Sequence, residues 1–315
     1  MPSPFEFAPR PLTSLLALAS IIAWRGAFGD DPMRQAADDI AKHCGPDRAR
    51  IAVIGDFGTG DATARAVADL VKSWNVQIIV TVGDNNYPTG SVESFERNVT
   101  HLYGEFLGRA DGTPNRFFPA LGNHDWMDPD KSGLPAPHLN FFALPGNERY
   151  YRHVQGDVEL FVVDSDSREP DGITADSVQA QWLRRALAES TAAWKWVVMH
   201  HAPFSSSAVH GSHPKLQWPF RQWGADVVFS GHDHSYERLE IDGLPYMVNG
   251  LGGAKRYFFL GDGIPGSKKR FSKQHGAVLT CTSSDAAWLA FITVDGGLVD
   301  QFELNKRLPV GGDAP

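Results

Sequence analysis

The chain has 315 residues, of which 42% are hydrophobic and 21% are charged, and its formal net charge at pH 7 is -8. This apolar fraction can fill the core of one large domain or two small ones. The negative charge argues against sequence-independent binding to nucleic acid, which depends on many Lys and Arg contacts with phosphates. An anionic substrate would therefore need local positive charge, which metal ions can supply.

The N-terminal segment has the pattern of a signal peptide. An apolar run at residues 11–24 follows Arg10, and it is short for a bilayer span but typical of a signal-peptide core. Ala27 and Gly29 are small residues ahead of a cut after Gly29. We therefore predict a signal peptide at residues 1–29 and a secreted or periplasmic protein. The alternative is an amphipathic or buried N-terminal helix in a cytoplasmic protein.

Two cysteines, Cys44 and Cys281, are too few for a disulfide framework, and neither belongs to a C-x-x-C pair. They could form one bridge in an exported protein or remain two buried thiols. The sequence leaves both possibilities open.

Strands and helices alternate from Arg50 onward. Residues 51–54 predict a short strand, residues 61–71 a helix and residues 76–82 a buried strand. Because this unit is β-α-β, its strands should be parallel, with Asp56 and Asp84 at the same end of neighbouring strands. The pattern then predicts a helix at 91–107, a strand at 117–121 and a Pro- and Gly-rich excursion at 126–148 that could form a flap over the site.

The second half of the chain continues the alternation and ends in antiparallel strands. No repeat or linker divides residues 45–305, so we predict one α/β catalytic domain at residues 30–310, with a mixed sheet or a two-sheet sandwich. The predicted elements are a hairpin at 150–153 and 159–163, a helix at 176–188, a strand at 194–199, a short helix at 216–223, and strands at 226–229, 236–241, 245–249, 286–294 and 298–304.

Five strand ends carry side chains that can bind a metal. Judged alone, a Gly-Asp turn after a strand is most often a cap, and a lone His is most often a satisfied polar group. The joint pattern differs, because oxygen and imidazole donors recur at the C-terminal side of predicted strands, where α/β folds place their sites. In an extended segment His232 and His234 would point to opposite faces. Both would reach one site only if the turn bends or if two metals lie side by side.

The number of donors favours two metal ions. Seven ligands are more than one ion takes from a protein while leaving room for substrate. The predicted ligands are Asp56, Asp84, Tyr87, Asn123, His200, His232 and His234.

These blocks resemble, in their order, the five signature blocks of the calcineurin-like metallophosphoesterases. Tyr87 narrows the resemblance to the purple acid phosphatases, because the cyclic-nucleotide phosphodiesterases and protein phosphatases of the superfamily lack it. The short stretch ahead of Ile51 makes the chain similar to the short, tartrate-resistant class. The blocks are Asp56-Phe57-Gly58, Gly83-Asp84-Asn85-Asn86-Tyr87, Gly122-Asn123-His124-Asp125, Val197-Val198-Met199-His200 and Gly231-His232-Asp233-His234.

The resemblance implies a fold and an assignment of ligands. The fold has four layers, α/β/β/α, in which two mixed β-sheets pack as a sandwich flanked by helices. A ferric ion would be bound by Asp56, Asp84, Tyr87 and His234. A second, divalent ion (iron, zinc or manganese) would be bound by Asp84, Asn123, His200 and His232, with Asp84 as the bridge.

The resemblance also implies a hydrolase of phosphomonoesters, similar to acid phosphatases, in which metal-activated hydroxide attacks phosphorus. His124 would face the phosphate and assist the leaving group. His210 is the best match for a second such histidine, with His201 and His213 as rivals.

Two other functions stay open at this point. One is a phosphodiesterase or phospholipase C-type activity at the same site. The other is an idle binding protein, against which the complete set of seven ligands argues. We expect a small phosphorylated substrate, no nucleic-acid partner, no stable membrane span and a monomer. Residues 98–100 also form an N-glycosylation sequon.

Overall fold

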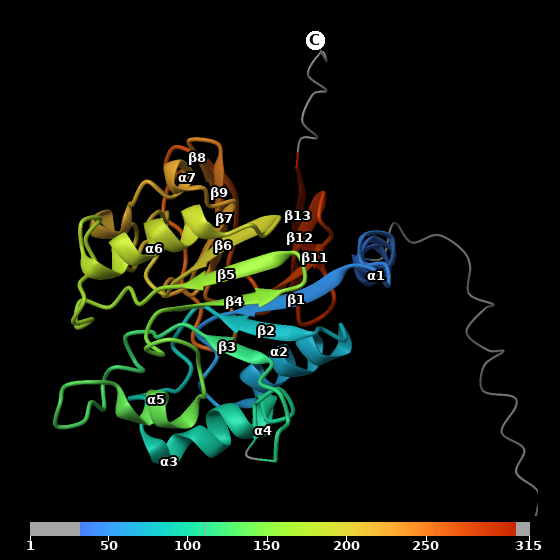
Figure 1. Ribbon diagram of the computed structural model, residues 1–315. Helices are drawn as coiled ribbons and strands as arrows, with labels where there is room; N and C mark the ends of the chain where they lie inside the picture. The colour runs from blue at the N-terminus through green and yellow to red at the C-terminus, as the bar shows by residue number, and fades with distance from the viewer. Residues whose placement is uncertain (1–31, 110, 307–315) are drawn as a thin grey trace, which may run out of the picture. The chain divides into compact units, whose positions relative to one another are not determined.

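The strands of the described residues form two mixed β-sheets (Figure 1). The computed structural model describes residues 32–109 and 111–306, so the predicted signal peptide at residues 1–29 lies outside the described residues. The first sheet has six strands in the order β13-β12-β11-β1-β2-β3, and the second has seven in the order β10-β8-β9-β7-β6-β5-β4.

The first sheet is built around the predicted β-α-β unit. β1 (Ala49–Ile54) pairs in parallel with β2 (Ile78–Thr81), and β2 pairs in parallel with β3 (Phe117–Pro119). The connecting helix α2 (Ala62–Ser73) begins where Asp61 accepts the backbone N–H groups of the first turn, and its apolar face is buried. The other side of the sheet is antiparallel and consists of β11 (Gly276–Thr282), β12 (Ala286–Thr293) and β13 (Leu298–Asn305).

The second sheet has a parallel centre between antiparallel edges. β4 and β5 form the predicted hairpin, the strands β5, β6, β7 and β9 are parallel, and β8 and β10 close the far edge. The strands are β4 (Tyr151–Gln155), β5 (Val158–Val162), β6 (Trp194–Val198), β7 (Val227–Ser230), β8 (Tyr236–Ile241), β9 (Leu244–Asn249) and β10 (Ser267–Phe271).

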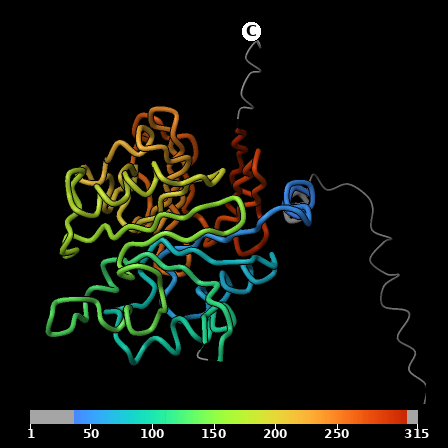
Figure 2. The backbone as a smooth tube through the Cα atoms, in the orientation of Figure 1, coloured from blue at the N-terminus to red at the C-terminus, as the bar shows by residue number. Residues whose placement is uncertain are grey.

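Alternation along the strands separates two apolar cores. Leu160 and Val162 of β5 belong to the core shared with β1, β2 and α2, whereas Phe161 belongs to the core beneath α6 (Val178–Glu189). Successive side chains of a strand point to opposite faces, so each sheet packs on its partner with one face and on helices with the other. Figure 2 traces the same path of the chain. The predicted four-layer α/β/β/α fold is confirmed.

The segment between β2 and β4 differs from the prediction in detail. The helix predicted at 91–107 is divided into α3 (Val92–Phe95), a π-helical turn (Glu96–Thr100) and α4 (His101–Tyr103). The predicted excursion contains α5 (Ala136–Phe141). Phe141 stacks on Phe95 of α3, with ring centroids 4.1 Å apart. The second half of the excursion therefore packs on the helical layer rather than standing free as a flap.

Several elements were missed by the sequence prediction: α1 (Pro32–His43), α5, β10 and β11. Cys44, after α1, forms a disulfide with Cys281 of β11, with a Cα–Cα distance of 5.2 Å. This settles the pairing that the sequence left open. The short helix predicted near 216–223 is a 3-10 turn (Pro214–Leu216) followed by α7 (Phe220–Trp223). Among the described residues, no helix is both long enough and apolar enough to span a membrane.

Candidate metal centre

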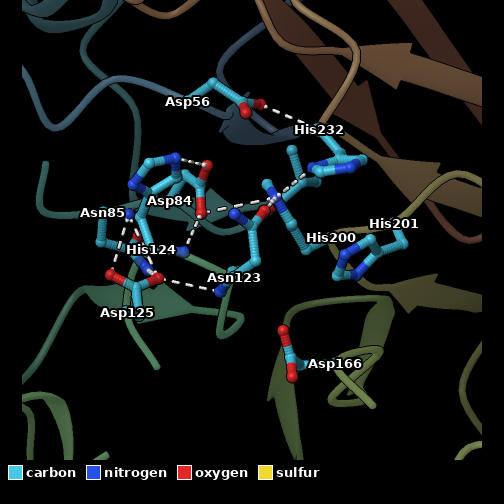
Figure 3. Close-up of polar contacts among 12 residues, drawn as sticks. Asp56, Asp84, Asn85, Asn123, His124, Asp125, Asp166, His200, His201 and His232 are labelled. Carbon is cyan, nitrogen blue, oxygen red and sulfur yellow. Dashed lines mark hydrogen bonds and ion pairs between the residues drawn. The ribbon is translucent and has the colours of Figure 1, made fainter. Parts of the chain in front are cut away.

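The candidate centre lies where the C-terminal ends of strands from both sheets meet. Asp56 follows β1, Asp84 follows β2, and Asn123 comes shortly after β3 in the same sheet. His200 follows β6 and His232 follows β7 in the other sheet. Figure 3 shows these five side chains pointing toward one another. The five strand ends that the sequence singled out thus come together in space.

Three of these residues adopt a backbone conformation that L-residues rarely use. The φ angles are 55° at Asp56, 52° at Asp84 and 67° at His232. Asp and His tolerate this left-handed region better than most residues, and non-glycine residues in it often mark functional sites. The turns also pack closely, since a Cβ at Gly122 would collide with the backbone nitrogen of Asp84. The sharp turns allow side chains from separate strand ends to share one small volume.

One group of side chains surrounds the phenol of Tyr87. Its Oη lies 2.8 Å from Asp84 Oδ2, 3.4 Å from Asp56 Oδ1 and 3.2 Å from His234 Nε2. His234 Nε2 is also 3.2 Å from Asp56 Oδ1. One phenol, two carboxylates and one imidazole therefore face a common point.

A second group surrounds the imidazole of His200. Its Nε2 lies 3.0 Å from Asn123 Oδ1, 3.1 Å from His232 Nδ1 and 3.4 Å from Asp84 Oδ1. Asp84 thus directs Oδ2 to the Tyr87 group and Oδ1 to the His200 group. His232 and His234 belong to different groups, so the turn between them serves two neighbouring positions.

Backbone carbonyls orient two of the imidazoles. His200 Nδ1 is 2.8 Å from the carbonyl oxygen of Val82, and His234 Nδ1 is 2.7 Å from that of Lys255. A carbonyl only accepts, so each Nδ1 carries the proton and donates. When these rings are neutral, the Nε2 lone pair of each therefore faces the centre, where it can bind a metal.

The charges at the centre fit a bound cation. The side chains of Asp56 and Asp84 are almost fully buried. Among the described residues only histidines form ion pairs with these two carboxylates, and no Lys or Arg does so. Buried carboxylates without a cation carry a large desolvation cost. Oxygens of Asp56 and Asp84 and a nitrogen of His200 lie within 4.8 Å of one another. The donor set therefore fits metal ions.

The pKa values at the centre follow from burial and these neighbours. Burial alone would raise the pKa of Asp56, but the hydrogen bond from His234 and the charge of His200 lower it below its ordinary value. Burial alone would lower the pKa of His200, whereas Asp84 and Asp56 raise it. Burial and the same carboxylates hold the pKa of Tyr87 well above its ordinary value. Without an ion, the phenol therefore keeps its proton and donates to Asp84.

Two predicted catalytic histidines lie beside the ligand groups. His124 Nε2 is 4.0 Å from Asp84 Oδ2, and the His124 ring centroid is 4.4 Å from that of Tyr87. His210 stacks on His232 with ring centroids 3.9 Å apart, and His210 is exposed to solvent. Both imidazoles are thus within reach of a molecule that approaches the centre.

The rival histidines have other surroundings. His201 is hydrogen-bonded through Nδ1 to Ser165 Oγ at 2.9 Å, and burial lowers its pKa to about 3. The ring of His213 is 5.7 Å from His201, and burial lowers its pKa. Both rings are partly buried, and their lowered pKa values make them poorly suited to hold a proton for a leaving group.

Further polar residues hold the ligand turns without having been assigned a role by sequence reasoning. Asp125 is fully buried and accepts the backbone N–H groups of Gly122 at 2.8 Å and Asn85 at 3.1 Å. Burial, together with the charge of Asp84, raises the pKa of Asp125 to about 7. Its place in the block with Asn123 was the available signal.

A model of the calcineurin-like phosphoesterase family matches residues 49–236. The chain belongs to this family. Its enzyme class is therefore that of the phosphoric ester hydrolases, as predicted from the five blocks.

Curated relatives are purple acid phosphatases. Purple acid phosphatase 4 of Arabidopsis thaliana is 23% identical over 287 residues, which cover 81% of this chain and 83% of the relative. Tartrate-resistant acid phosphatase type 5 of Mus musculus is 22% identical, covering 61% and 65%. Fe(3+)-Zn(2+) purple acid phosphatase 12 of Arabidopsis thaliana is 27% identical, covering 67% and 49%. The chain thus spans about half to four-fifths of the length of these relatives, and the predicted resemblance to purple acid phosphatases is confirmed.

A solved structure of the purple acid phosphatase PPD1 from yellow lupin seeds (Lupinus luteus) matches the fold with a TM-score of 0.68 at 17% identity. The match covers 82% of this chain and 54% of the lupin chain. It supports the two-sheet architecture described above.

Proposed function

We propose that the chain hydrolyses phosphomonoesters at a centre of two metal ions, as acid phosphatases do. The observation that carries this proposal is the position of Asp84, whose Oδ2 faces Tyr87 at 2.8 Å while Oδ1 faces His200 at 3.4 Å. A carboxylate between two donor groups is suited to bridge two ions. The names of the curated relatives support the choice of a phosphomonoester as substrate.

The first ion is ferric in this proposal, and the second is divalent iron, zinc or manganese. A phenolate and two carboxylates suit a hard trivalent cation, whereas Asn and His leave the second position less negative. The relative named for Fe(3+) and Zn(2+) supports this pair of metals. The first ion would be held by Asp56, Asp84, Tyr87 and His234, and the second by Asp84, Asn123, His200 and His232.

The ions, when bound, would polarise phosphate oxygens and lower the pKa of water at the centre. The protein itself orients the ligands through the carbonyls of Val82 and Lys255. His124 and His210 flank the two ligand groups. We assign to them contact with the phosphate and a proton for the departing alcohol.

Paired assays test the substrate class. The metal-loaded protein should hydrolyse p-nitrophenyl phosphate faster than bis(p-nitrophenyl) phosphate. A much faster reaction of the diester would favour the phosphodiesterase or phospholipase C-type alternative instead.

Metal analysis should find two ions per chain, and a tyrosinate-to-iron charge-transfer band should be visible in the absorption spectrum. Absence of stoichiometric iron, zinc or manganese would revive the idle binding protein.

We also propose that the chain is exported, to the periplasm or the medium. The buried Cys44–Cys281 disulfide supports this location, because such bridges persist mainly in oxidising compartments. N-terminal sequencing of the mature protein should find a cut after Gly29. An intact N-terminus on protein from the cytoplasm would contradict both export and the signal peptide. The monomeric state and the 30–310 domain stay predictions, which size-exclusion chromatography and limited proteolysis can test.

A further inference from the structure

The loop after β5 contacts the two turns that carry Asn123 and His200, both proposed ligands of the second metal position. In the structure Asp164, Ser165 and Asp166 are all almost fully buried. Figure 3 shows Asp166 on the same side of the centre as Asn123 and His201.

Arg168 connects this loop to the turn that carries Asn123. Its Nε and Nη2 donate to the two carboxylate oxygens of Asp166, at 2.7 and 2.8 Å. Its Nη1 donates to the carbonyl of Trp126, and its Nη2 also donates to the carbonyl of Asn123, both at 3.0 Å. The paired contact with Asp166 fixes the plane of the guanidinium, and that plane then holds two backbone oxygens of the neighbouring turn.

The base of this loop is itself anchored. Asp164 accepts the indole N–H of Trp126 at 2.9 Å and the backbone N–H of Asp166 at 2.9 Å. Its own backbone N–H donates to the side chain of Gln179 on α6 at 2.7 Å. These hydrogen bonds fix the loop, and the contacts with Asp166 fix Arg168 to the loop.

Ser165 connects the same loop to the turn that carries His200. Its Oγ accepts the backbone N–H groups of His200 at 3.2 Å and His201 at 2.8 Å. Because Oγ accepts twice, its own hydrogen is directed to His201 Nδ1 at 2.9 Å. One loop thus holds the backbone on which His200 stands and the backbone on which Asn123 stands.

The two ligands that this loop holds come from different sheets. Asn123 follows β3 of the first sheet, and His200 follows β6 of the second. Their donor atoms are only 3.0 Å apart, so a small shift of either turn would change the shape of the second position. The Tyr87 group has no contact of this kind with residues 164–168 among the described residues.

We propose that Arg168 and Ser165 are positioning residues for the second metal position, acting through the backbones of Asn123 and His200. The inference rests on the two-ion centre proposed above. Partners of this kind affect metal affinity by about 10- to 100-fold. Loss of Arg168 should therefore weaken the binding of the second ion by about 10- to 100-fold and leave the first ion bound.

Metal content measured over a series of buffered free Zn²⁺ concentrations tests this. Wild type should show two binding transitions. Arg168→Gln should shift only the weaker transition, by about 10- to 100-fold toward higher Zn²⁺. Arg168→Lys keeps the charge beside Asp166 but cannot hold both carbonyls, so its shift should be smaller. Ser165→Ala should shift the same transition.

Arg152→Gln is the matched control. Arg152 on β4 is 47% exposed and pairs with Glu159, and Arg168 is 42% exposed and pairs with Asp166. The Zn²⁺ titration of the Arg152→Gln variant should coincide with that of wild type. Turnover of p-nitrophenyl phosphate by Arg168→Gln should recover when Zn²⁺ is raised, with a KM close to that of wild type.

Four results separate the possible failures. An unchanged second transition in Arg168→Gln overturns the inference, as does an equal shift of both transitions, which would indicate a general structural role. If Arg168→Gln does not fold, unchanged transitions in both Arg168→Lys and Ser165→Ala overturn it. Fewer than two transitions in wild type would instead contradict the two-ion centre itself, whatever the variants do.

Discussion

Of the seven proposed ligands, those of the first sheet are all oxygen donors, whereas those of the second sheet are all imidazoles. Asp56, Asp84, Tyr87 and Asn123 follow strands of the first sheet, and the three histidines follow strands of the second. Each proposed ion takes ligands from both sides. Neither sheet therefore carries a complete site, and the metals would join the two sheets at the edge where the apolar core ends.

The largest effect should come from removing Asp84, the carboxylate that the two proposed ions would share. Asp84→Ala should lose both ions and reduce kcat/KM by more than about 100-fold, which exceeds the loss from outer contacts to a ligand. Metal analysis and p-nitrophenyl phosphate assays measure both. Asp61→Ala, at the start of α2 and outside the ligand set, is the control and should keep both ions. Retention of both ions and of turnover by Asp84→Ala would show that Asp84 is not the bridge.

Metal removal should loosen the contact between the sheets. With free ion at about 1,000 times its Kd, binding contributes about 4 kcal/mol to the free energy of unfolding. Chelation should remove this contribution, as measured by urea unfolding with and without EDTA. The Asp84→Ala protein should not respond to EDTA. An equal response of both proteins would mean that the ions do not join the sheets through this residue.

The disulfide should stabilise the first sheet without affecting the centre. Cys281 lies opposite Arg50, near the start of β1, whereas Asp56 follows the end of that strand. The double variant Cys44→Ala/Cys281→Ala should lose about 3 kcal/mol of unfolding free energy, within the usual range for a removed bridge. Urea unfolding measures this, and metal content should stay unchanged. Loss of metal would show that the two ends of the first sheet are coupled.

A smaller effect should appear in acid at the helical layer of the first sheet. His138 of α5 is fully buried, neither ring nitrogen has a hydrogen-bond partner among the described residues, and burial lowers its pKa from 6.5 to about 3. His138 therefore stays neutral in the folded state at pH values at which it takes up a proton in the unfolded chain. The contribution of this histidine is complete above pH 6.5 and is lost as the pH falls toward 3.

His138→Leu removes this titration. Between pH 6.5 and pH 5 the wild type should lose about 2 kcal/mol more unfolding free energy than the variant. Urea unfolding at the two pH values measures the difference. His101→Gln, on an exposed side chain, should behave like wild type. Identical pH dependence of His138→Leu and wild type would contradict the assignment.

Much of the candidate centre was predictable because its proposed ligands follow strands. A short apolar run closed by Gly-Asp or Gly-His indicates both a strand and the polar end that the sheet presents. The parallel pairing of β1 with β2 then placed Asp56 beside Asp84, as the structure has it. His232 and His234 both reach the centre because they belong to two adjacent donor groups and because the turn bends at His232, where φ is 67°.

What could not be predicted depends on contacts between distant parts of the chain. β11 lies at the centre of the first sheet, but its Thr and Cys residues give no clear apolar run and no functional turn follows it. The hydrogen bond from Arg168 to the carbonyl of Asn123 joins residues 45 positions apart, and no local spacing in the sequence indicates it. The π-helical turn at Glu96–Thr100 is likewise not indicated by the helical periodicity of residues 91–107.

That turn has a practical consequence for the choice of expression host. It places Asn98 inside the protein, where the amide nitrogen donates to Asn86 Oδ1 at 2.9 Å and to the carbonyl of Tyr87 at 2.7 Å. Asn98 is also the acceptor residue of the only sequon noted in the chain. A glycan added there before folding would occupy the nitrogen that holds the segment of Tyr87. A bacterial host, or an Asn98-preserving Thr100→Ala variant in a eukaryotic host, avoids that conflict.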